Sequence, residues 1–205
     1  MKKQTIRSSI MLTAISLLLY AGSSCTTMVL RSRGVKNPSF QTEQRIRAFL
    51  GKRGVPGYDG SFLVKDSTSF FNLIKRIHSY PSVSYFTPHG ELIIINDSGY
   101  CAGVAYNYGT TFTSGKPVRI DTSFSLPELN RLIRPLNFPA VIDTGDADII
   151  LVACWATYLG KINDNVFATC AAVRNNDYVR SRIYLINIDF LDSWGMTSIG
   201  KKIYQ

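Results

Sequence analysis

The sequence contains little of what hydrolases and metalloenzymes use for catalysis. It has two histidines, His78 and His89, and no Gly-x-Ser-x-Gly, Cys-x-x-Cys or His-Glu-x-x-His motif. His89 falls in a predicted turn, and His78 falls at the end of a predicted helix, where a cation is favourable in any case. Isolated histidines do not predict a metal site. We therefore expect no metal, no cofactor and no hydrolytic triad.

Two further stretches contain part of a ligand-binding motif and lack the rest of it. Residues 51–60 hold four glycines, but they lack the Gly-Lys-Ser/Thr and the preceding strand of a phosphate-binding loop. Residues 143–148 hold three aspartates, but they lack the spacing and the late glutamate of an EF-hand. We expect both stretches to be turns.

Cysteine is scarce: the chain has Cys25, Cys101, Cys154 and Cys170. Cys154 falls in a predicted buried strand and Cys170 on the apolar side of the next helix, so both are expected to be core residues. Cys101, in a glycine-rich stretch, is the one expected to be exposed. If the protein were a thiol enzyme, Cys101 would be its candidate catalytic residue.

The N-terminus has the pattern of a secretory signal. Basic residues Lys2, Lys3 and Arg7 precede an apolar run over Ile10–Ala21. A membrane-spanning helix needs about 20 apolar residues, so this run is too short to be one. We expect residues 1–24 to be removed as a signal peptide.

The residues that follow resemble a bacterial lipobox. Gly22-Ser23-Ser24-Cys25 places small residues before a cysteine, although Gly22 stands where that motif prefers leucine. The resemblance implies a lipid on Cys25, a tether over residues 25–40, and a place in the bacterial envelope facing the periplasm. The alternative is a secreted protein cut near Gly22.

The charge balance is basic. The 23 basic and 14 acidic residues give a net charge of +9. Removing residues 1–24 takes away three basic residues and leaves twenty against fourteen, a net +6. The basic residues are spread from Arg31 to Lys202 without clustered base-stacking groups, so we expect no nucleic-acid partner. Loose attraction to anionic surfaces such as lipid headgroups is expected instead.

The longest apolar stretch of the mature chain predicts a buried strand. Ile149–Trp155 is apolar without a break, which is typical of a strand covered on both faces. A turn over Thr157–Lys161 and a helix starting near Asn163 follow. A β-rich run over Arg182–Asp189 completes a strand–helix–strand unit, which predicts an α/β fold.

This unit resembles the core of the thioredoxin family, whose active-site strand ends in W-A-x-W-C-G-P-C and whose next strand ends in N-x-D. The matching residues are Trp155, Ala156, Gly160, Asn187 and Asp189. The two family cysteines fall on Leu159 and Ile162, and the family's buried acid falls on Ala153. The resemblance therefore implies the scaffold without thiol–disulfide exchange, which needs both sulfurs.

A second stretch resembles the family's hairpin, which begins I-P-T with a cis proline. The matching residues are Pro81, Ser82, Phe86 and Gly90. In thioredoxins this hairpin follows the active-site helix, whereas here it precedes it. One explanation is a circularly permuted thioredoxin-like sandwich, a central mixed sheet flanked by helices over residues 41–205. The other is an α/β sandwich with an unrelated N-terminal hairpin.

Local patterns predict the remaining elements: helices over Gln41–Leu50 and Ser67–Ile77, a strand at Phe62–Val64, a strand within Tyr100–Thr113, and a helix from Ser125, with Glu128 completing a capping box and an apolar face that continues to Leu136.

The resemblance places a peptide-binding groove near Pro81, Trp155, Tyr158 and Lys161, with free strand backbone for pairing. The alternative interpretation is that these residues only preserve the fold. The functional hypothesis is a non-catalytic envelope lipoprotein that binds a peptide or protein. The alternatives are a thiol oxidoreductase using Cys101 and a structural envelope protein held by its lipid.

Overall fold

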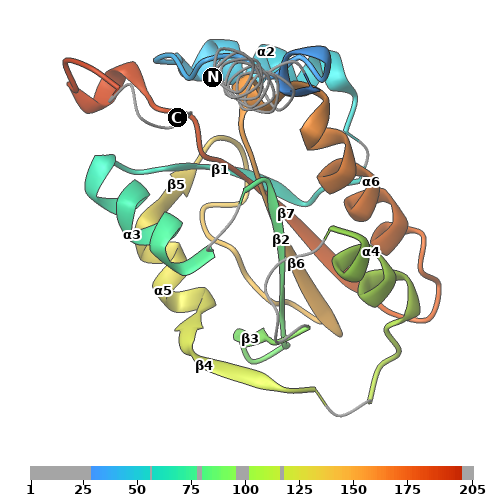
Figure 1. Ribbon diagram of the computed structural model, residues 1–205. Coiled ribbons are helices and arrows are strands. Elements are labelled where there is room, and N and C mark those ends of the chain that lie inside the picture. Colours follow the sequence, from blue (N-terminus) through green and yellow to red (C-terminus); the bar gives the residue numbers. More distant parts are fainter. Residues whose placement is uncertain (1–28, 56, 78–79, 96–101, 116–117, 200–205) are drawn as a thin grey trace, which may run out of the picture.

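A seven-stranded mixed β-sheet forms the centre of the molecule (Figure 1). The computed structural model describes residues 29–55, 57–77, 80–95, 102–115 and 118–199. The strands are β1 (Gly60–Val64), β2 (Ser82–Phe86), β3 (Glu91–Ile93), β4 (Ile120–Ser125), β5 (Ile133–Pro135), β6 (Ile149–Trp155) and β7 (Ser181–Asn187). Their order across the sheet is β4-β3-β2-β6-β7-β1-β5. Strands β6, β7 and β1 run parallel, and β2 pairs antiparallel with β6.

Every residue of β6 is buried, as its unbroken apolar sequence predicted. Because side chains alternate along a strand, Leu151 and Trp155 enter one core cluster while Ile150 and Val152 enter the other. Its two edges are covered as well, by β2 and β7. The strand is thus enclosed on all sides.

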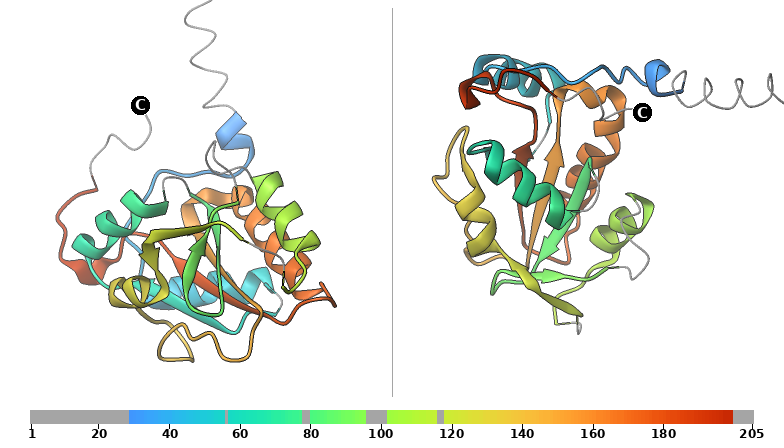
Figure 2. Two further views of the ribbon diagram at one scale, coloured as in Figure 1. Left: turned by 90° about the horizontal axis from the view of Figure 1, so that it is seen from below. Right: turned by 60° about the vertical axis from the view of Figure 1, so that its left-hand side comes forward.

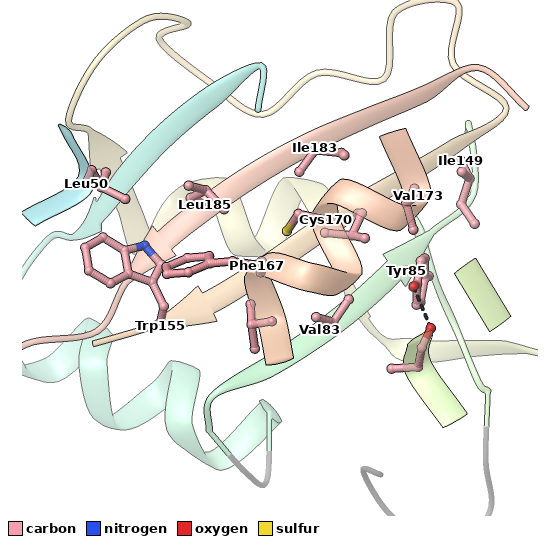
Figure 3. Close-up of a cluster of buried hydrophobic side chains, with 14 of the residues drawn as sticks. Leu50, Val83, Tyr85, Ile149, Trp155, Phe167, Cys170, Val173, Ile183 and Leu185 are labelled. Atoms are coloured by element: carbon pink, nitrogen blue, oxygen red, sulfur yellow. Dashed lines mark hydrogen bonds between the residues drawn. The ribbon is translucent and has the colours of Figure 1, made fainter. Parts of the chain in front are cut away.

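Helices cover both faces of the sheet (Figures 1 and 2). One face is packed by α4 (Ala102–Thr111) and α6 (Asn163–Arg174), with side chains of α2 (Glu43–Arg53) joining the same cluster. The other face is packed by α3 (Ser67–Ile77) and α5 (Leu126–Leu132). Two short 3₁₀ helices, η1 (Thr157–Ile162) and η2 (Asp192–Trp194), follow β6 and β7. Figure 3 shows the cluster beneath α6, with Phe167, Cys170 and Val173 over the sheet.

The strand–helix–strand unit and the hairpin are confirmed. Strand β6, helix α6 and strand β7 follow one another as predicted, and β2 pairs with β3 through Phe86 and Leu92. The start of α5 is confirmed too, because Glu128 accepts hydrogen bonds from the Ser125 N–H at 2.9 Å and from its hydroxyl at 3.0 Å. The helix ends at Leu132, where the chain turns into β5 rather than continuing to Leu136.

The strand predicted within Tyr100–Thr113 is wrong: residues 102–111 form α4. Glycine weakened the helical signal there, yet Gly109 has a packing role. A Cβ at Gly109 would lie 2.3 Å from the Tyr85 hydroxyl and from a methyl group of Val173. The glycine therefore lets α4 approach both α6 and β2. Tyr85 donates to the carbonyl of Ala105 at 2.7 Å, the bond drawn in Figure 3.

Truncation of Leu151 to alanine is expected to lower the free energy of unfolding by about 2–5 kcal/mol, because it leaves a cavity beside a fully enclosed strand. Denaturant titration followed by circular dichroism measures this. Ile120→Ala on β4, where the side chain is 39% exposed, is the matched control and is expected to cost under about 1 kcal/mol. Equal losses in the two variants would contradict the central position of β6.

Candidate functional site

The structure brings the four predicted binding residues to one end of the sheet. Ser82 pairs with Cys154, so Pro81 lies beside the end of β6, where Trp155 leads into η1. The Tyr80–Pro81 peptide is cis. Pro81 is half-buried and Lys161 is exposed. We refer to residues 155–162 as the β6–η1 turn.

Two of these residues are enclosed in the core. Trp155 is 0% exposed, and its indole stacks on Phe49 with ring centroids 5.2 Å apart and planes 17° apart. Tyr158 is 4% exposed and belongs to the cluster on the opposite face of the sheet. Their rings therefore hold the turn in place, while Pro81 and Lys161 are the members of the set that solvent reaches. The assignment of binding to this set stays a prediction.

A buried carboxylate ties the end of β7 to the turn. Asp189 is 1% exposed and accepts hydrogen bonds from the Thr157 N–H at 2.8 Å, the Thr157 hydroxyl at 2.8 Å and the Asn187 amide at 2.7 Å. The carboxylate thus satisfies a backbone donor that the first turn of η1 leaves free. Burial raises the pKa of Asp189 above the usual carboxyl range, although the Thr157 and Asn187 hydrogen bonds act in the opposite direction.

A second buried side chain, the amide of Asn163, hydrogen-bonds to the backbone of the β6–η1 turn. Asn163 is 0% exposed, and its side-chain amide donates to the carbonyls of Ala156 at 2.8 Å and Gly160 at 3.2 Å. Its carbonyl oxygen accepts from the Ala156 N–H at 3.3 Å. The sequence predicted that a helix starts near this residue. The structure shows that the Asn163 side chain hydrogen-bonds to Ala156 and Gly160, which precede it, and so fixes the shape of the β6–η1 turn.

The N-terminal segment crosses the turn and pairs with its backbone. The N–H of Lys36 donates to the carbonyl of Tyr158 at 2.8 Å, and the N–H of Lys161 donates to the carbonyl of Arg33 at 2.8 Å. A Cβ on Gly160 would lie 2.4 Å from the carbonyl oxygen of Gly34, so this glycine permits the close approach. The segment and the turn therefore run antiparallel in backbone contact. We refer to residues 33–41 as the docked segment.

The docked segment continues along the chain that follows β7. The Gln41 N–H donates to the carbonyl of Phe190 at 2.8 Å, and the Asp192 N–H donates to the carbonyl of Gln41 at 3.2 Å. Phe40 packs against the core cluster below. The sequence predicted a tether over residues 25–40. From Arg33 onward the structure instead shows a segment bound to the domain, as the top of Figure 2 (right) illustrates. The apolar Phe40 was the sequence signal for this docking.

The described thiols are not reactive groups. Cys154 and Cys170 are free and buried, and burial raises the pKa of each to about 12. A thiol with that pKa contains almost no thiolate at neutral pH. Leu159 is buried, as a core residue would be. Cys101 and Cys25 lie outside the described residues.

Within the described ranges no group of three or more His, Cys, Asp or Glu side chains is placed to hold a metal ion. No helix in the same ranges is long and apolar enough to cross a membrane. Comparison with protein-family models, with curated proteins and with solved structures gave no match for the chain.

Replacement of Asp189 by asparagine is expected to change how stability depends on pH. A carboxyl whose pKa is raised on folding stabilises the native state at low pH, and this contribution is lost as pH rises through the raised pKa. Wild type should therefore lose free energy of unfolding, relative to Asp189→Asn, as pH rises from about 4 toward neutrality. Urea titrations across that range measure the difference. If the free energy of unfolding of wild type instead rises relative to that of Asp189→Asn as pH increases, the hydrogen bonds to Asp189 outweigh its burial.

Alkylation of Cys154 and Cys170 with iodoacetamide at neutral pH is expected to be slow in the native protein and to become fast in denaturant, because both thiols are buried and protonated. Mass mapping of the modified peptides reads out each site separately. Rapid native labelling of either cysteine would mean that the sheet or α6 opens readily.

Proposed function

We propose that the protein is a non-catalytic, thioredoxin-like envelope lipoprotein that binds an extended peptide or protein segment at the β6–η1 turn. One observation carries the proposal: the turn already holds another piece of chain by two backbone hydrogen bonds, one to Lys36 and one to Arg33. Backbone pairing gives affinity without demanding a particular side chain. A turn that binds its own N-terminal segment in this way has the chemistry to bind another.

The arrangement of the sheet supports a permuted thioredoxin-like fold. The two stretches that resemble the family are far apart in the chain and in the reverse order, yet β2 pairs directly with β6 over five residue pairs. Strand β7, which ends in Asn187, flanks β6 on its other side. An unrelated hairpin would have no reason to bring Pro81 to the end of β6. This supports permutation over the alternative of an unrelated N-terminal hairpin.

The proposal of a non-catalytic role rests on the residues in the turn. Leu159 and Ile162 occupy the family's cysteine positions, and neither side chain forms a thiolate. The acid-bearing position of the family is Ala153, which is 0% exposed and apolar. The envelope location and the lipid on Cys25 remain proposals drawn from the N-terminal sequence.

The Lys36→Pro substitution tests the binding proposal. Proline removes the N–H that donates to Tyr158 and so weakens the docked segment. We expect a labelled peptide with the sequence of residues 33–41 to bind this variant about tenfold more tightly than wild type, because the competing segment is loosened by roughly 1.4 kcal/mol. Fluorescence anisotropy measures the affinities.

Asn37→Pro is the matched control, because the Asn37 N–H donates no hydrogen bond among the described residues. It should leave peptide affinity unchanged. Binding by neither variant at millimolar peptide would refute the peptide-binding proposal. Fast alkylation of Cys101 together with reduction of insulin would favour a thiol enzyme in its place.

A further inference from the structure

The net positive charge of the protein beyond residue 28 is concentrated at its N-terminal end. Residues 29–55 contain seven basic residues and one acidic residue, a net +6. Residues 57–205 contain thirteen of each and are neutral overall. The separation is sharper than the spread of basic residues along the sequence suggested, because the thirteen basic residues after position 56 are matched by thirteen acidic residues in the same stretch.

All seven basic residues are exposed. Arg53 pairs with Asp164, and Arg47 lies 4.0 Å from Glu43, which also pairs with Arg134 at 2.6 Å. The other five form no ion pair with any residue that the structure describes: Arg31, Arg33, Lys36, Arg45 and Lys52. Their charges are therefore available to an external partner.

The fold gathers these charges at one end of the molecule. The docked segment lies on the β6–η1 turn through Arg33 and Lys36. Helix α2 meets the same turn, because the Arg53 guanidinium donates to the Gly160 carbonyl at 3.1 Å. Arg45 and Lys52 are seven residues apart, so they lie on one face of α2. Figure 2 (right) shows the segment and α2 together across the top of the sheet. We refer to the five unpaired residues as the basic end.

We propose that the basic end docks on the anionic surface of a phospholipid bilayer. Charge complementarity favours an anionic partner, since juxtamembrane basic residues are drawn to acidic headgroups. Arg33 also lies only eight residues after Cys25, and eight residues span at most about 28 Å. If Cys25 carries the lipid proposed above, the anchor holds the basic end at the bilayer.

A nucleic acid is the less suitable partner for this surface. Binding of single strands combines cations with exposed aromatic rings for stacking. The exposed large apolar residues of the described chain include aromatic rings on α3, α4 and two loops, but none on α2 or the docked segment. The basic end supplies charge without stacking groups, as a headgroup layer requires.

Vesicle flotation of the full-length chain tests the proposal. The readout is the ratio of partitioning into phosphatidylglycerol-containing vesicles to partitioning into phosphatidylcholine vesicles, so that any contribution of the apolar N-terminal run cancels. Arg45→Gln with Lys52→Gln should lower this ratio about 25-fold, or about fivefold for each residue. Thermal unfolding of each variant checks that the fold is kept.

Lys75→Gln with Arg131→Gln is the matched control, because it removes the same charge from exposed, unpaired residues on α3 and α5. Its ratio should stay within about twofold of wild type. Equal losses in both pairs would overturn the proposal in favour of net charge alone. An unchanged ratio in the first pair, with loss of DNA binding, would overturn it in favour of a nucleic acid. Neither pair alters the backbone atoms of the β6–η1 turn, so these outcomes are independent of the peptide-binding test.

Discussion

Seven consecutive residues of β6 are buried, and this burial constrains the rest of the structure. A strand enclosed on both faces needs two layers of helices, and a strand enclosed on both edges needs a partner on each side. Strands β2 and β7 supply the edges, and the clusters beneath α6 and α3 supply the faces.

Two buried side chains satisfy backbone groups near the end of β6. Asp189 holds the start of η1, and Asn163 holds its end. Between them the turn presents the Tyr158 carbonyl and the Lys161 N–H, which the docked segment binds through Lys36 and Arg33.

Much of the fold could be predicted because its signals are local. The apolar run of β6, the spacing of Phe70 and Leu73 on α3, and the Ser125–Glu128 pair each specify one element within a few residues. Helix α4 could not be predicted, because the glycine that weakens its pattern is explained only by Tyr85 and Val173 across the interface. The binding role of the candidate site residues stays a prediction, and the sequence did not indicate that Trp155 and Tyr158 are enclosed in the core.

The sequence by itself determined that the chain builds an α/β core around Ile149–Trp155 and that residues 155–162 contain no cysteine. Those properties follow from residue type and short-range spacing. Only the tertiary structure decided that Trp155 faces inward onto Phe49, that residues 33–41 cover the turn, and that the unpaired basic charge lies at one end. Each of these depends on contacts between residues distant in the chain, which no local pattern encodes.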